Sequence, residues 1–586
     1  MGKTSKKKAG DISKKRAVTK DKKLGAKAIS KYAATDKIHN IQGKQAVQVQ
    51  ISKVLTDFDK LLNDKKVAEA QKLLNSLTGL KKWQKLNLQS MIEYAKGDEK
   101  RTEACLREAL REDDVIGHVG RNLATVLVKQ GRMREGLPFA EKSYESNPTD
   151  LKTLHVYINC LLDLGKSDRA LEVCKKALET YPDDKLINVS QASSLRSQMK
   201  NDEALEKIDD LIIRMPEEPV VKRIKADILG DKDSSQALPY YQEALDLSIE
   251  QKGKPDPAIM WNMSLHLLRC RELEQGWDCW EQGFHPVVGT MGRNLPKRIN
   301  DMERADADGK EIDRSKWTII CSEQGIGDQV LFMHSLNEAI NELGKVLFVA
   351  EKRMHPILQR SFPGIVIGCS GTTYDWSRTS LAKNGYIPLG SIPRRHRKSV
   401  DAYHKHRVPF LKANKDLYQK YRSVLQKEAN GRPIIGISWR GGFWQIQRKT
   451  KALDIALWEP IFKKDALFVN LQYGDISQDI KYINEKGHRI LHFNKVNYQN
   501  DLDDWLAIAA ACDGIISIST ALVHFAGAVG QKVAVVMPGK QGPWHLGLED
   551  KESLAYKNVR VFRPENEETI DKVVQRVADL IIENEI

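Results

Sequence analysis

The feature that most constrains this chain is a 34-residue spacing that recurs through its N-terminal half. Three sets of residues keep this spacing in phase: Gly97, Gly131 and Gly165; Gly136, Ala170 and Ala204; and Pro148, Pro182 and Pro216. A small residue at a fixed position lets two helices cross closely, and a proline ends a helix because it lacks the backbone N–H. The spacing therefore predicts repeated helix pairs over residues 45–290.

These columns resemble the tetratricopeptide (TPR) repeat, whose copies stack into an all-α solenoid. The resemblance implies a concave groove that holds an extended peptide or a partner helix, so we expect a protein or peptide partner. A purely structural spacer or dimerisation arm is the alternative. The last unit, from Ala258 to Phe284, contains Trp261, Trp277 and Trp280, which predicts a cap on which the second half of the chain docks.

Composition sets the broad class of the protein. Of its 586 residues, 41% are hydrophobic and 29% are charged, as in ordinary globular proteins, and the length predicts two or three domains. No apolar run reaches the roughly 20 residues of a membrane-spanning helix, and no signal-peptide core follows the basic N-terminus. The eight cysteines form no Cys-x-x-Cys pair, so we expect reduced thiols and a cytoplasmic protein.

The net charge of +15 is concentrated in residues 1–44, which hold fourteen Lys or Arg and three Asp. Few large apolar residues accompany these charges, so a disordered basic tail is predicted. A basic tail can contact nucleic acid or an anionic membrane, but no aromatic residues alternate with these charges. We therefore expect a solvated leader without a nucleic-acid partner.

After the repeats, residues 291–315 are predicted to be a charged linker, and apolar runs then alternate with helical patterns. This alternation predicts two α/β lobes, residues 316–428 and residues 429–586. We expect the first lobe to open with a strand from Trp317 to Cys321 and a helix from Gln329 to about Leu343, and the second to close with a helix from about Glu567 to Ile582. The run from Arg394 to Lys398 in the first lobe could hold an anionic acceptor, but we expect it to be solvated.

The stretch 514–539 is the most informative part of the second lobe. Its pattern predicts a buried strand (Gly514 to Ile518), a helix that opens at Ser519 or Thr520 and stops at Gly530, and a second strand (Val533 to Met537). A helix that begins at the carboxyl end of a parallel strand directs free N–H groups into the crevice of the sheet, which favours phosphate. His524, one turn into the helix, can join this site, although a simple helix cap with a packed histidine explains the same residues.

The sequence Ser519-Thr520-Ala521-Leu522-Val523-His524 resembles the donor-diphosphate loop of heptosyltransferase-like (family 9) glycosyltransferases. Their pattern is Asp-Thr-Gly/Ala-x-x-His, so Thr520 and His524 match, and Ser519 replaces the Asp. In the first lobe, the segment from Glu323 through Gly325 and Gly327 to Asp328 resembles the opening motif of the TPR-fused branch of this family. The resemblance implies that Asp328 is the base that activates the acceptor.

Other segments carry the same resemblance, including Ile387 to Pro393 in the first lobe. The resemblance implies that Lys451, or as second choice Arg448, helps to neutralise the donor diphosphate. It also places four residues of the second lobe in loops around the cleft, namely Trp439, Gly441, Gln472 and Trp544. Asp306-Ala307-Asp308 mimics the Asp-x-Asp metal motif of other glycosyltransferases, but no strand precedes it, so linker polarity is the expectation.

Together these motifs imply the GT-B fold, in which two Rossmann-like lobes face each other and no catalytic metal is needed. The expected function is metal-independent transfer of a sugar from a nucleotide-sugar donor, with no further cofactor. The expected acceptor is a protein side-chain hydroxyl presented by the TPR array. Two alternatives stay open: a TPR scaffold whose transferase-like domain is inactive, which Ser519 in place of Asp favours, and a transferase for a lipid-linked or polysaccharide acceptor.

Overall fold

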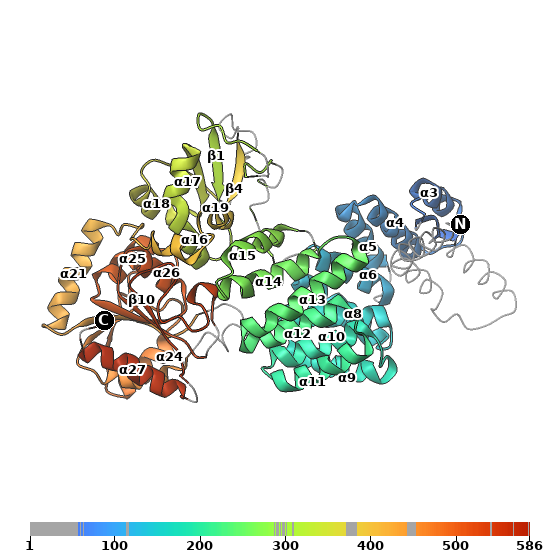
Figure 1. Cartoon of the computed structure of the whole chain (residues 1–586). Coiled ribbons are helices and arrows are strands. Elements are labelled where there is room, and N and C mark those ends of the chain that lie inside the picture. Colours follow the sequence, from blue (N-terminus) through green and yellow to red (C-terminus); the bar gives the residue numbers. More distant parts are fainter. Residues whose placement is uncertain are drawn as a thin grey trace, which may run out of the picture. The chain divides into compact units, whose positions relative to one another are not determined.

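The structure is a computed structural model that describes residues 57–586 except 59, 63, 113–116, 286, 289–291, 294, 296–298, 300–301, 307–309, 371–383, 442–452, 540–541, 566–567 and 584 (Figure 1). The predicted basic tail lies outside the described residues. The chain divides into two compact units, Met1–Ala204 and Leu205–Ile586, and helix α11 (Asn201–Arg214) contains the boundary.

The first unit consists of helices that pack in sequential pairs. They are α3 (Val67–Ser76), α4 (Lys82–Lys96), α5 (Glu99–Glu112), α6 (Gly117–Lys129), α7 (Met133–Ser146), α8 (Leu151–Asp163), α9 (Ser167–Thr180) and α10 (Lys185–Ser197). The predicted small-residue column lies where paired helices cross, since Ala170 is fully buried and a Cβ on Gly136 would lie 3.4 Å from the carbonyl oxygen of Ala124. The predicted TPR-like helical solenoid is therefore confirmed.

The turns between paired helices follow the glycine column. Gly97, Gly131 and Gly165 have φ angles of 82°, 75° and 70°, a left-handed conformation that glycine adopts without steric cost. The next position in the column is Met199, which keeps the same conformation with a φ of 65°. The backbone turn of the repeat therefore persists where the glycine signal is lost.

The second unit begins with further helix pairs and the predicted tryptophan-rich cap. Its helices are α12 (Pro219–Lys232), α13 (Ser234–Lys252), α14 (Pro257–Arg269) and α15 (Leu273–Trp280), followed by the 3-10 helix η1 (Glu281–Phe284). Trp277 is fully buried and its ring meets Phe332 and Trp544, which belong to the two α/β lobes. The last helical unit therefore docks on the α/β region, as predicted.

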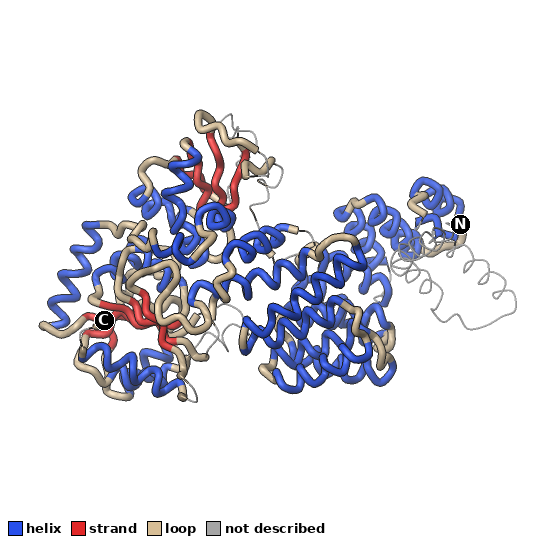
Figure 2. Tube along the Cα trace, in the orientation of Figure 1, coloured by secondary structure: helices blue, strands red, loops and turns tan. Residues whose placement is uncertain are grey.

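The first lobe contains a four-stranded parallel sheet in the order β3-β2-β1-β4 (Figure 2). Its strands are β1 (Trp317–Cys321), β2 (Lys345–Ala350), β3 (Val366–Cys369) and β4 (Gly385–Pro388). The lobe's helices are α16 (Ile326–Phe332), η3 (Met333–Ser335), α17 (Leu336–Leu343), η4 (Lys352–Met354), α18 (His355–Ser361), η6 (Leu389–Ser391), α19 (Ile392–His396) and α20 (Val400–His404). The helix predicted from Gln329 thus begins three residues earlier, at Ile326.

The second lobe contains a six-stranded parallel sheet in the order β10-β9-β8-β5-β6-β7. Its strands are β5 (Ile434–Ser438), β6 (Leu467–Asn470), β7 (Ile490–Leu491), β8 (Gly514–Ile518), β9 (Val533–Val536) and β10 (Val559–Phe562). Numbered within the lobe, this order is 3-2-1-4-5-6, the doubly wound arrangement of nucleotide-binding sheets. The β-α-β unit predicted over residues 514–537 is confirmed, because β8 and β9 pair in parallel.

Helices of the second lobe are η7 (Ile455–Trp458), α23 (Glu459–Phe462), α24 (Ser477–Glu485), α25 (Leu502–Ala511), α26 (Ala521–Ala528), η8 (Trp544–Leu546) and the closing α27 (Ile570–Ile582). Helix α21 (Lys415–Ala429) packs on α25, β5 and β6, so it belongs to this lobe, whereas the sequence-based boundary at residue 428 assigns it to the first. None of the helices in the described ranges has the length and apolar character that crossing a membrane requires.

Candidate functional site

The candidate site lies at the point where the strand order of the second sheet reverses. Strands β5 and β8 are neighbours in this sheet, and the chain leaves them toward opposite sides, the topology in which a ligand-binding crevice is typically found at the carboxyl ends of the strands. The loop that begins with Trp439 follows β5, and Ser519 and Thr520 follow β8. The predicted phosphate loop therefore occupies the position at which doubly wound sheets receive their ligands.

Thr520 is the N-cap of α26, with an extended backbone and a side-chain oxygen that accepts from the backbone N–H of Leu522 at 3.3 Å. Its hydroxyl also lies 3.3 Å from that of Ser517 at the end of β8. Ser519 and Ala521 are half-buried beside it. The junction therefore presents the start of a helix at the crevice, and a hydroxyl rather than a carboxylate stands at position 519.

His524 lies one turn into α26 and is buried. Its Nδ1 is 3.2 Å from the hydroxyl of Tyr556, and its ring centroid is 4.5 Å from that of His545. Burial raises the pKa of Tyr556 well above its ordinary value, and the neighbouring Tyr403 and Asp328 add to the effect, so this phenol keeps its proton. Nothing in the sequence pattern indicated Tyr556, because a tyrosine 32 residues further along the chain carries no local signal.

Helix α16 of the first lobe crosses α26 at this place. A Cβ on Gly327 would lie 3.0 Å from Cδ2 of His524 and 3.2 Å from Cα of Ala521. A glycine is therefore needed at the crossing, and the two motifs that carry the family resemblance come from separate lobes to meet there.

Asp328 occupies the first turn of α16, next to Gly327, and is exposed to solvent. One of its carboxylate oxygens, Oδ2, lies 3.1 Å from the place that a Cβ on Gly325 would take, so the side chain folds back toward the start of its helix. A carboxylate in the first turn is stabilised by the helix dipole, and an exposed one can accept a proton from a bound hydroxyl. Gly325, Gly327, Asp328, Ala521 and His524 thus share one region.

Other residues that the resemblance placed around the cleft have structural roles. Gln472 is buried, and its Oε1 accepts from the hydroxyl of Ser438 and from the N–H groups of Trp439 and Arg440 at 2.9–3.1 Å, which fixes the turn after β5. Trp439 itself is 1% exposed and lies in the apolar core. These two side chains hold the loop in place and do not line an open cleft.

Trp544, which was predicted to lie in a loop around the cleft, packs against the helical cap. Its ring packs against Trp277 of α15 at 5.2 Å, and its carbonyl oxygen accepts from Arg271 at 2.9 Å. A large apolar ring next to the helical cap gains more from burial there than from exposure in a cleft. Gly441 is buried directly before segment 442–452, and Lys451 and Arg448 lie outside the described residues.

The basic run that was expected to be solvated forms ion pairs, and one of its residues is buried. Arg394 contacts Asp278 of α15 at 2.6 Å, Lys398 contacts Glu274 of α15 at 2.8 Å, and Arg395 pairs with Glu342. Arg397 is 1% exposed and donates to His334 and Glu338. The expectation holds for Arg395 and Lys398, which are exposed, and fails for Arg397, because η3 and α17 of the same lobe enclose it and supply its partners.

A polar hollow of about 490 Å³ lies beside this run. It is lined by side chains of the cap, the 291–315 segment and the first lobe, namely Asp278, Asp306, Glu342, Ser391, Arg394, Arg395 and Lys398. Asp306, part of the predicted mimic of a metal motif, accepts from Arg304 at 2.6 and 2.9 Å. Among the described residues, no three His, Cys, Asp or Glu side chains are grouped in a way that could hold a metal ion.

Comparisons with known proteins give distant similarities. No family model matches the chain. Protein FlbA of Caulobacter vibrioides is 25% identical over 453 residues, which cover 74% of this chain and 73% of FlbA.

Solved structures of TPR proteins also match the chain. A tetratricopeptide repeat protein from Parabacteroides merdae matches with a TM-score of 0.34 at 14% identity and covers 39% of this chain and 90% of its own. TTC0263, a TPR protein from Thermus thermophilus, matches with a TM-score of 0.27 at 19% identity and covers 32% of this chain and 99% of its own. At these scores, the TPR-like assignment rests on the helix pairs of the chain itself.

Proposed function

We propose that this protein is a glycosyltransferase with a GT-B fold, in which the second lobe binds a nucleotide-sugar donor and the first lobe carries the base. The observation that carries the proposal is the crossing of α16 and α26. There, Gly327 and Asp328 of one motif meet Ala521 and His524 of the other, beside the strand-order reversal of a 3-2-1-4-5-6 sheet.

The donor side of the proposal rests on the start of α26. Free N–H groups at a helix N-terminus favour phosphate, and Thr520 holds this terminus at the crevice through its cap. His524 contributes a ring whose Nδ1 is held by Tyr556. Lys451 and Arg448 follow β5 in the sequence, and the family resemblance implies that one of them adds positive charge to stabilise the leaving diphosphate.

The acceptor side rests on Asp328 and on the helical repeats. An exposed carboxylate can take the proton of an acceptor hydroxyl as the new glycosidic bond forms, an effect of about 10²- to 10⁴-fold. TPR-like helices commonly bind peptides, so a protein hydroxyl is the proposed acceptor. The polar hollow lined by Asp278, Ser391 and Arg394 adjoins the same lobe and is suited to a polar chain.

A donor-binding test decides between this function and an inactive scaffold. We expect one member of a panel of UDP-, GDP-, ADP- and CMP-linked sugars to raise the melting temperature, because a ligand at 100 times its Kd adds about 2.7 kcal/mol to stability. Asp328→Asn should keep this shift and lose turnover by about 10²-fold or more, whereas His524→Ala should weaken both.

The matched control is Asp401→Asn, which removes an exposed carboxylate from the first turn of α20 in the same lobe. This variant should turn over like the wild type. If no nucleotide sugar shifts the melting temperature and none is hydrolysed or transferred, the scaffold alternative, which Ser519 favours, replaces the proposal. Normal turnover by Asp328→Asn would reject Asp328 as the base.

A further inference from the structure

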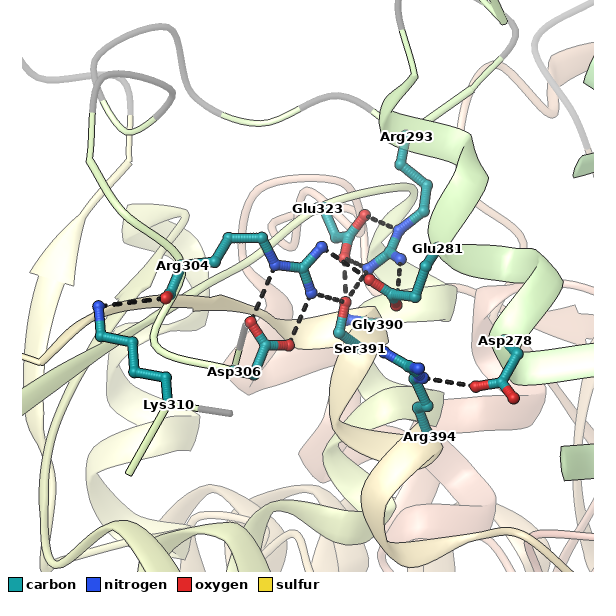
Figure 3. A network of polar contacts seen from close by, with 10 residues as sticks. All are labelled: Asp278, Glu281, Arg293, Arg304, Asp306, Lys310, Glu323, Gly390, Ser391 and Arg394. Atoms are coloured by element: carbon teal, nitrogen blue, oxygen red, sulfur yellow. Dashed lines mark hydrogen bonds and ion pairs between the residues drawn. The ribbon is translucent and has the colours of Figure 1, made fainter. Parts of the chain in front are cut away.

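The first lobe has its own strand-order reversal, between β1 and β4, and a side chain from outside the sheet fills it. The sheet order β3-β2-β1-β4 places the loop after β1, which begins at Ser322, beside the turn that follows β4, Leu389 to Ser391. Such a crevice is where open parallel sheets receive ligands. Here it contains the guanidinium group of Arg293, which belongs to the segment 291–315 that is predicted to be a charged linker (Figure 3).

The side chain of Arg293 is 0% exposed and makes polar contacts with three residues. Its Nε donates to Glu323 Oε2 at 2.8 Å, and its Nη2 contacts the other oxygen of the same carboxylate. Its Nη2 also donates to the hydroxyl of Ser391 at 2.8 Å, and its Nη1 donates to Glu281 at 2.8 Å. This is the two-pronged geometry in which arginine binds carboxylates most strongly.

The network extends to the helical cap and to the turn after β4. Glu281 lies in η1, directly after the last cap helix, and also pairs with Arg304 at 2.7 Å. The backbone N–H of Gly390 donates to Glu323 Oε1 at 2.9 Å. Burial alone would lower the pKa of Arg293, but Glu323 and Glu281 raise it above its ordinary value, so the buried group stays charged. Each charge in the crevice is therefore matched by a partner from another segment.

Glu323 stands in the loop that leads to Asp328, five residues before it. Gln324, the next residue, has a left-handed φ of 61°, which costs a non-glycine residue free energy. The side chain of Gln329 donates to the carbonyl oxygen of Gln324 at 3.2 Å. The loop is thus held in a strained conformation by Glu323 on one side and by Gln329 on the other, and α16 begins immediately after it.

We propose that Arg293 is a positioning residue, which occupies the crevice of the first lobe and, through Glu323, fixes the loop that presents Asp328. The assignment of a catalytic task to this loop rests on the proposed glycosyltransferase function. Because Arg293 is also paired with Glu281, which directly follows the last cap helix, the geometry of the loop that leads to Asp328 depends on the docked helical cap. The first-lobe crevice is closed to nucleotide, which leaves the crevice between β5 and β8 for the donor.

The test combines amide hydrogen exchange with kinetics in the full chain. The two variants are Glu323→Gln and Arg293→Lys; the latter keeps the positive charge but cannot form the paired hydrogen bonds of a guanidinium group. In both we expect the amide exchange rate of the peptide 322–328 to rise at least tenfold. Exchange of the peptide 514–530 in the second lobe should stay at the wild-type rate. Kinetics are measured with the nucleotide sugar from the panel that the wild type hydrolyses. In both variants we expect kcat to fall about tenfold and the KM for this nucleotide sugar to stay unchanged, because the donor contacts lie in the other lobe.

The matched control is Glu274→Gln, which removes an exposed ion pair between the same cap and the same lobe, that with Lys398. It should leave both exchange and kinetics unchanged. Wild-type exchange at 322–328 in both network variants would overturn the proposal, as would an equal rise in both peptides or a rise in KM with kcat unchanged. If the loop loosens selectively but the wild type hydrolyses no nucleotide sugar, the anchoring role stands and the glycosyltransferase function fails.

Discussion

His334 shows how a single buried residue can couple stability to pH. Its Nδ1 accepts from Nε of Arg397 at 2.9 Å, and its ring stacks on Tyr403 with centroids 5.3 Å apart. Burial is the main cause that lowers the pKa of His334 from 6.5 to about 3, and the positive charge of Arg397 lowers this pKa further. The native protein therefore holds this imidazole neutral, whereas the unfolded chain binds a proton below about pH 6.5.

Stability should consequently fall as the pH drops below 6.5, because the unfolded state then binds one more proton at this site than the native state. Between pH 7 and pH 5 we expect His334 to account for a loss of about 2 kcal/mol. His334→Asn keeps an acceptor for Arg397 and cannot titrate, so urea unfolding at the two pH values should show a smaller loss for this variant. The exposed His285→Asn should behave like the wild type, and an equal pH dependence in all three proteins would contradict the assignment.

Single residues also mark the limit of prediction from sequence. The left-handed turns of the repeats coincide with the glycine column, but Met199 adopts the same φ without any sequence signal, because the surrounding helix pair imposes it. Arg293 was assigned to a polar linker, since a charged residue is normally solvated unless partners surround it. Its partners come from positions 281, 323 and 391, and such long-range pairing cannot be deduced from local composition.

At the scale of elements, helix α26 depends on a glycine in its interior. A Cβ on Gly527 would lie 2.6 Å from Cγ of Tyr556, the residue whose hydroxyl contacts His524. On an open helix surface, alanine in place of glycine would stabilise by about 1 kcal/mol. Here we expect Gly527→Ala to destabilise the protein by about 2 kcal/mol, because the tyrosine ring must move in a packed core.

Thermal unfolding of this variant measures the effect, and Gly364→Ala provides the comparison. A Cβ on Gly364 would meet nothing within 4 Å, so that variant should change stability by less than about 0.5 kcal/mol. A stabilised Gly527→Ala protein would show that Tyr556 is free to shift. In that event, its role in holding His524 would have to be abandoned.

Elements whose pattern is local were predicted well, and elements set by tertiary packing were not. The strands β1 and β8 have the predicted bounds, because short apolar runs between polar junctions define buried parallel strands. Helix α16 begins earlier than predicted because Gly327 reads as a loop residue in sequence. In the fold, the same glycine is required inside a helix where α16 and α26 cross.

At the scale of the whole molecule, the predicted domain boundaries and the compact units differ. The sequence pattern ends the repeats at residue 290, where the tetratricopeptide spacing gives way to α/β character. The structure places residues from Leu205 onward in one compact unit with both lobes. The reason is chemical, because the cap contributes Trp277 of α15 and Arg271 of the turn before α15 to the α/β region, and Arg271 pairs with Asp550 at 2.7 Å.

This arrangement predicts where the chain can be divided. A chain of residues 201–586, which begins with α11, should fold and unfold cooperatively. A chain of residues 291–586 should not, because it loses Trp277 and Trp280 from the core and leaves Arg293 without Glu281. Removing one buried tryptophan side chain typically costs about 3–5 kcal/mol, a large part of the about 5–15 kcal/mol by which a domain is stable.

Circular dichroism melts and size-exclusion chromatography of the two chains provide the measurement. The 201–586 chain should elute as a compact species with a sharp transition, and the 291–586 chain should aggregate or melt without cooperativity. Trp277→Ala in the 201–586 chain should lower its stability by about 3–5 kcal/mol, because Phe332 and Trp544 then border a cavity. If the 291–586 chain were as stable as the longer one, the cap would be a neighbour of the α/β lobes and not part of their core.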